Sequence, residues 1–196
     1  MADQERPDPP KTPVWEPPLA GSDAQHLAGM LDRLRYTFRW KADGLTREQL
    51  GQTLPPSMLS IGVLLKHLAV CEDDIFAWRI NGEPPEAWLS ALDDVDPAVW
   101  QFTLTDDDTA EQLYDLYDQS VIRSRRRMAE IIAADRLDAQ AHQEWDGVHL
   151  SVRRCISDFI EELGRHTGHA DLIREAVDGR VGEDPDDEWT PPAAWA

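Results

Sequence analysis

The sequence predicts an all-α protein, a four-helix bundle with one long crossover connection. Four segments place apolar residues three or four positions apart, which is the spacing of one helix face. Capping residues or glycines bound these segments, and no stretch is rich in strand-forming residues. The 196 residues, 41% of them hydrophobic, are enough for one domain with a substantial core. We expect the four apolar stripes to pack against one another.

The first two helices are expected at about 22–43 and 60–80. Each begins at a serine, Ser22 or Ser60, whose hydroxyl can accept a hydrogen bond from a free amide of the first turn. The apolar stripe of the first is Leu27, Leu31, Leu34 and Phe38, and that of the second is Ile61, Leu64, Leu68, Cys71 and Ile75.

The other two helices are expected at about 109–135 and 151–178. Acidic residues precede the third helix and favour its N-terminus, and Gly179 ends the fourth. The stretch of about 28 residues at 81–108 is long for a bundle connection, so we expect a folded crossover there. Residues 142–150 are expected to form a loop.

The chain divides into three parts. Residues 1–21 form a proline-rich arm, residues 22–179 form the bundle, and residues 180–196 form an acidic tail with prolines and tryptophans. Trp189 and Trp195 are unusual in such a tail, so we expect them to dock on the domain or on a second copy of it.

Charge and composition exclude several classes of function. The net charge of −19 opposes binding to nucleic acid or to an anionic membrane. No apolar run approaches the ~20 residues that span a bilayer, and the N-terminus has no apolar signal segment. Two cysteines are too few for a disulfide framework and suit a reducing compartment. We expect a soluble, cytoplasmic protein.

Two of the expected helices carry side chains that can bind a metal ion. Glu162 and His166 lie one turn apart along one edge of the fourth apolar stripe, and His67 borders the second stripe. Packed together, the two helices would bring these three side chains to one spot. Three such ligands and one open position make a catalytic site of the zinc type. The alternative, a surface ion pair of Glu162 with His166 and an ordinary half-buried His67, stays open from spacing alone.

Three other side chains could assist such a site. His169 lies further toward solvent and is expected to orient a ligand or meet the substrate. Cys71, one turn after His67, is either a fourth ligand or a small core residue. Arg127 lies near the third apolar stripe and could bind an anionic substrate, although a solvated cation balancing nearby acids is the simpler interpretation. No catalytic residue is predicted.

The segments "SMLSIGVLLKHLAVCEDDIFAW" and "EELGRHTGHADLIREAVDG" resemble the two ligand segments of the DinB-like superfamily of metal-binding four-helix bundles. Aligned on Gly168, the two histidines of the second segment fall at Glu162 and His166, and its glutamine falls at His169. Glutamate departs from the commonest pattern, but a relative, mycothiol-dependent maleylpyruvate isomerase, has a glutamate ligand there. The resemblance covers most of residues 22–180 and is strongest to a branch without an assigned reaction, related to thiol S-transferases.

The resemblance implies a metal trio of His67, Glu162 and His166 and a divalent ion, zinc or alternatively nickel. It further implies that the protein binds a low-molecular-weight thiol of the mycothiol type. The protein would either transfer this thiol to a small electrophile or isomerise that electrophile. We therefore expect a metal-dependent thiol S-transferase or isomerase. The alternative is a non-catalytic helical homodimer with a vestigial or structural metal site, which the eight tryptophans favour because aromatic residues concentrate at interfaces.

Overall fold

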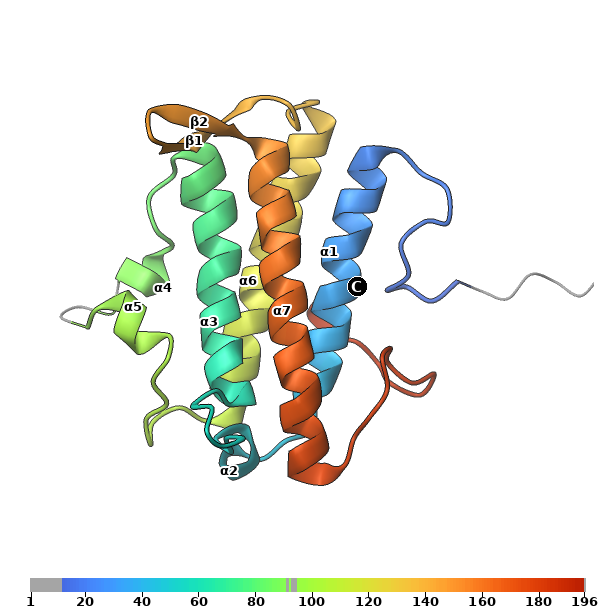
Figure 1. Ribbon diagram of the computed structural model, residues 1–196, viewed down its shortest axis with the longest axis vertical. Coiled ribbons are helices and arrows are strands. Elements are labelled where there is room, and N and C mark those ends of the chain that lie inside the picture. Colours follow the sequence, from blue (N-terminus) through green and yellow to red (C-terminus); the bar gives the residue numbers. More distant parts are fainter. Residues whose placement is uncertain (1–11, 91, 93–94, 196) are drawn as a thin grey trace, which may run out of the picture.

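Four long helices form a bundle, which confirms the predicted all-α fold (Figure 1). The computed structural model describes residues 12–90, 92 and 95–195. The part of the predicted N-terminal arm at 1–11 lies outside these residues. The long helices are α1 (Asp23–Ala42), α3 (Ile61–Asp73), which continues as the π-helical segment η1 (Asp74–Arg79), α6 (Ala110–Ala133) and α7 (Val152–Asp178).

Polar caps set where these helices begin and end. At each of the four starts, a serine or threonine hydroxyl accepts a hydrogen bond from the amide three residues later, which satisfies a donor that the helix leaves free. At the end of α7, Gly179 adopts the left-handed conformation, with φ of 82°. The expected boundaries therefore agree with the observed ones within two residues.

The crossover makes α3 and α6 run in the same direction. Near their starts Lys66 Nζ lies 3.3 Å from Asp108, and further along both helices the Ser120 hydroxyl donates to Asp73. Helices α1 and α7 also run parallel to each other and opposite to α3 and α6 (Figure 1). As a result, α7 lies antiparallel to α3.

Short elements fill the connections. Helix α2 (Arg47–Leu50) lies between α1 and α3, and the crossover folds into α4 (Ala87–Ser90) and α5 (Pro97–Trp100), which lie along the outside of α3 (Figure 1). The crossover is therefore folded, as the sequence predicts. Asp96 caps α5 and Pro97 occupies its first turn, where a missing amide donor costs nothing.

Residues 140–151 form a β-hairpin, whereas a loop is expected at 142–150 from the sequence. Strand β1 (Gln140–Trp145) pairs with antiparallel β2 (Val148–Ser151) and covers one end of the bundle (Figure 1). Asp146 and Gly147 form its turn with φ of 52° and 79°. Asp-Gly is the residue pair that a two-residue hairpin turn favours, so the expectation of a loop at 142–150 is wrong.

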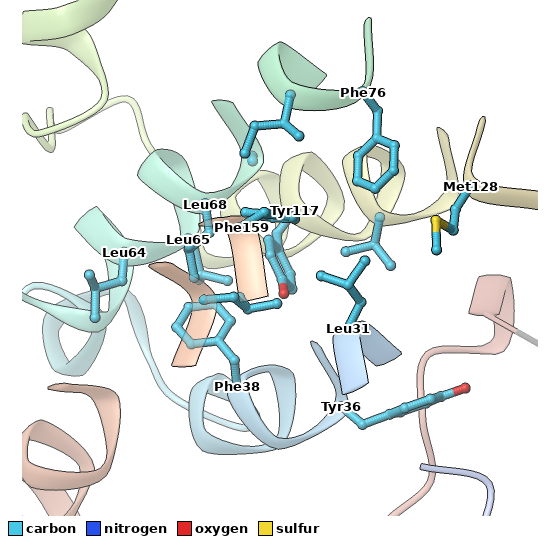
Figure 2. Close-up of a cluster of buried hydrophobic side chains, with 14 of the residues drawn as sticks. Leu31, Tyr36, Phe38, Leu64, Leu65, Leu68, Phe76, Tyr117, Met128 and Phe159 are labelled. Carbon is cyan, nitrogen blue, oxygen red and sulfur yellow. The ribbon is translucent and has the colours of Figure 1, made fainter. Parts of the chain in front are cut away.

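The core lies along the axis between the four long helices. Figure 2 shows side chains from all four converging there, and these residues are fully buried: Leu31, Phe38, Leu64, Leu65, Leu68, Phe76, Tyr117 and Phe159. Burial of each large apolar side chain stabilises the fold by about 1.5–3 kcal/mol.

An ion pair crosses this apolar core. The Arg35 guanidinium donates to both Glu72 carboxylate oxygens at 2.7 Å and to the Ser124 hydroxyl at 3.0 Å. Both charged side chains are at most 1% exposed. Burial opposes the charge, yet the Glu72 carboxylate holds the pKa of Arg35 above its usual range. The pair ties α1, α3 and α6 together.

The C-terminal tail packs on the bundle. Trp195 is 6% exposed and lies against Tyr36 and Tyr117, with ring centroids 5.3 and 6.1 Å away. Trp189 also packs on Tyr36, and its indole donates to Asp43. The two tail tryptophans thus dock on the chain's own helices. Within the described residues, no helix combines the length and the hydrophobicity needed to cross a membrane.

Replacing Glu72 with Ala should lower the free energy of unfolding by about 3–5 kcal/mol, because the buried Arg35 would lose its bidentate carboxylate and keep only the partly exposed Asp32 as a charged partner. The matched control is Glu130→Ala, which removes an exposed partner of Arg126 and should cost less than about 0.5 kcal/mol. Urea denaturation followed by circular dichroism measures both. Equal effects of the two substitutions would contradict this role of the buried pair.

Candidate metal centre

The antiparallel packing of α3 and α7 brings three donor side chains together. Glu162 and His166 face the same side of α7 because they are one turn apart, and His67 faces them from α3. Glu162 Oε1 lies 3.1 Å from Nε2 of each imidazole. The three donor atoms all lie within 4.8 Å of one another. Both histidines are 8% exposed, whereas Glu162 is half-buried.

The crossover fixes the orientation of His67. Its Nδ1 lies 2.8 Å from the side-chain oxygen of Gln101, and the Phe102 ring stacks on the imidazole at a centroid distance of 4.9 Å. Because an amide oxygen only accepts, Nδ1 of His67 must donate to it. Nε2, on the other side of the ring, lies toward Glu162 and is the nitrogen that would bind a metal ion.

His166 has its own hydrogen-bonding neighbour on α7. Its Nδ1 lies 3.3 Å from Nδ1 of His169, on the opposite side of the ring from Glu162. Burial and the nearby His67 lower the pKa of His166, which favours its neutral form near pH 7. Burial of Glu162 opposes its charge, but hydrogen bonds and charges from the two histidines lower its pKa below the usual value.

These donors fit a divalent cation. In the tautomers that leave both Nε2 atoms unprotonated, the two lone pairs and the carboxylate repel one another unless a positive charge lies between them. Around a tetrahedral ion with bonds of about 2.0 Å, neighbouring ligand atoms are about 3.3 Å apart, close to the 3.1 Å that separates Glu162 Oε1 from each imidazole. Nitrogen and oxygen donors of this kind suit zinc and nickel.

Cys71 lies beside the three donors. Its Sγ is 3.6 Å from Nε2 of His67, one helical turn away. Burial, together with the charge of Glu162, raises the pKa of Cys71 to about 12. In the absence of an ion this thiol therefore carries its proton at neutral pH, and it does not add a charge to the cluster.

Arg127, the remaining candidate from the sequence, lies elsewhere, and so do the two histidines of the hairpin. Arg127 does not reach the cluster; its guanidinium holds the crossover by donating to Glu83 and Glu86 at 2.8 and 2.6 Å. In the hairpin, His149 bonds a backbone carbonyl and His142 packs on Trp78.

A cavity of about 430 Å³ opens beside the cluster, and its lining is largely polar. Gln101, Phe102 and the hairpin residue Gln143 contribute to it and were not singled out from the sequence. They come from connections, where no periodic pattern indicates which way a side chain points. The lining is completed by His67, Val70, Cys71, Asp74, Ile75, Arg79, Cys155, Asp158, Glu161 and Glu162.

Comparison with protein families gives a match over residues 26–179 to the family described as mycothiol S-transferase. The chain belongs to the mycothiol S-transferase family. This match confirms the resemblance to the DinB-like superfamily and narrows it to one family. No curated protein matches the chain.

Among solved structures, this mycothiol S-transferase family member is similar to the crystal structure of a conserved protein from Enterococcus faecalis. The match has a TM-score of 0.58 and 19% identity, and it covers 82% of this chain and 100% of the other. At this identity the likeness concerns the fold.

Replacing Glu162 with Ala should abolish tight zinc binding, because the carboxylate joins both imidazoles. His169→Ala should weaken binding by only about 10–100-fold, since His169 contacts a ligand and not the centre of the cluster. Glu175→Ala, at an exposed glutamate of the same helix, is the matched control and should leave affinity unchanged. Isothermal titration with zinc measures all three. A larger loss for His169→Ala than for Glu162→Ala would make His166 and His169 the ligand pair instead.

Proposed function

We propose that this protein is a divalent-metal-dependent thiol S-transferase that joins a low-molecular-weight thiol such as mycothiol to a small electrophile. The main support is a cluster of two imidazoles and one carboxylate beside a polar cavity, in a chain of the mycothiol S-transferase family. The two tail tryptophans pack on the chain's own helices and so lend no support to the alternative, a non-catalytic dimer.

His67, Glu162 and His166 would hold the ion, for which zinc is the first candidate and nickel the second. Three protein donors leave at least one position free for a substrate. When bound, the ion lowers the pKa of a coordinated thiol and thereby supplies a thiolate near neutral pH. Gln101 and His169 hydrogen-bond the outer nitrogens of the two imidazoles and would keep both rings turned toward a bound ion.

The cavity beside the cluster suits a polar, roughly neutral thiol. Its volume of about 430 Å³ lies within the usual range for small-molecule sites. Two of its acids are already paired, Asp74 with Arg79 at 2.6 Å and Asp158 with Arg154 at 2.7 Å. The side chain of Gln143 offers both a hydrogen-bond donor and an acceptor.

In the proposed transfer, the thiol sulfur uses a lone pair to form a bond with the electrophilic carbon. The bond from that carbon to its leaving group breaks, and the leaving group departs with the bonding pair. The thiol proton is lost to solvent. Both cysteines of the chain are free, and a thiol substrate must stay reduced, so the cytoplasm is the proposed location.

The zinc-loaded protein should accelerate conjugation of mycothiol to N-methyl bromoacetamide above the uncatalysed rate. The acceleration should be lost in Glu162→Ala and kept in the control Glu175→Ala, because only the first removes a proposed ligand. Bromide release, measured against a protein-free reaction, reports the rate. Equal rates in wild type, Glu162→Ala and buffer, across a panel that also includes glutathione and cysteine, would reject thiol transfer.

A further inference from the structure

A second cavity, of about 460 Å³, lies between α3, η1 and the crossover. Its lining is mainly apolar and is formed by Val70, Asp73, Asp74, Ala77, Trp78, Pro85, Glu86, Leu89, Ser90 and Pro97. The metal-side cavity described above is polar by contrast. Neither the family match nor the proposed ligands assign a role to this second space.

The two cavities adjoin each other along α3. Val70 and Asp74 line both of them. His67 precedes these two residues by one and two turns and belongs to the metal-side cavity, whereas Ala77 follows Asp74 by about one turn and belongs to the apolar one. Val70 and Asp74 therefore lie at the border between the apolar cavity and the cavity beside the three donors.

Hydrogen bonds and an ion pair from α3 and α6 hold the crossover in place against α3. The Trp88 indole donates to Asp73 at 2.8 Å, and the Glu86 carboxylate accepts from Arg127 at 2.6 Å. At the other end, Lys66 donates to the Thr103 carbonyl. These contacts fix the wall opposite α3, so the cavity is formed before any ligand binds.

The charged group deepest in this cavity is already neutralised. Asp73 is 1% exposed and accepts hydrogen bonds from both Arg123 and Ser120 in addition to Trp88. A buried carboxylate with its partners in place offers no free charge to a ligand. The remaining surface, with Val70, Ala77 and Leu89, favours an uncharged apolar group.

We propose that this apolar cavity binds the body of the electrophilic substrate, and that the substrate is a hydrophobic alkylating agent. Its alkyl or aryl group lies between α3 and α4, and its electrophilic carbon points past Val70 toward the thiol in the metal-side cavity. This inference rests on the proposed thiol transfer and adds the class of the second substrate. The sulfur–carbon bond forms as the carbon–halogen bond breaks, and the halide leaves with the bonding pair.

The test uses N-alkyl bromoacetamides with mycothiol and the zinc-loaded protein. The reactive carbon and the bromide leaving group are the same throughout, and the alkyl chain grows from methyl to octyl. In wild type, kcat/KM should rise about fourfold per added methylene until the cavity is filled, because each buried methylene contributes about a factor of four to transition-state binding. Uncatalysed rates should not change with chain length.

Two substitutions in the cavity should flatten this rise. Leu89→Asp adds a carboxylate to the apolar wall, and Ser90→Trp, at an exposed position, fills the space if the first variant folds poorly. Leu172→Asp, at an exposed leucine of α7, is the matched control and should keep the wild-type slope. A wild-type rate that is independent of chain length, or an equal slope in Leu89→Asp and Leu172→Asp, would overturn the inference. In either case, transfer of the thiol to the methyl compound would still support the proposed function.

Absence of transfer to every electrophile would reject the proposed function instead. The cavity is then tested directly by calorimetric titration with the unreactive N-alkyl propionamides. Affinity that rises with chain length in wild type, and not in Leu89→Asp, would still support a binding site for an apolar group. Lack of binding by all of them would overturn it.

Discussion

The register between α3 and α7 is the constraint on which the site depends. The two helices run antiparallel, and His67 lies opposite the single turn of α7 that holds Glu162 and His166. A shift of either helix by one residue would rotate its side chains by about 100° and separate the donors. Apolar packing on both helices and the buried pair of Arg35 with Glu72 resist such a shift. The stability of the core and the geometry of the candidate metal centre therefore have the same origin.

Residues of the crossover orient one donor of this cluster and enclose the cavity next to it. Gln101 and Phe102 orient His67, while α4 encloses the apolar cavity next to it. Arg127, a candidate substrate ligand from the sequence, holds this segment through Glu83 and Glu86. The long connection thus contributes both an outer hydrogen bond for a ligand and the wall of a binding space, which is a common role for loops placed by a rigid scaffold.

The four long helices could be predicted from the sequence because they follow helical periodicity, and the same periodicity places the candidate donors His67, Glu162 and His166 beside their apolar stripes. Leu64, Leu68 and His67 have positions that 100° per residue determines, and so do Glu162 and His166. The hairpin has a turn signal at Asp146 and Gly147, but its strands are short and mostly exposed, so no apolar alternation marks them in the sequence. Gln101 and Gln143 could not be predicted, since the direction of a side chain in a connection depends on long-range packing.

The central claim is that three protein donors, without a thiolate of the chain, hold the ion and leave a position for an external thiol. Zinc K-edge X-ray absorption of the loaded protein tests it most directly. We expect nitrogen and oxygen neighbours at about 2.0–2.1 Å, multiple scattering from two imidazoles, and a sulfur neighbour at about 2.3 Å only after a thiol is added. A sulfur neighbour before that addition, from Cys71 as a fourth ligand, would contradict the claim and indicate a closed, structural centre.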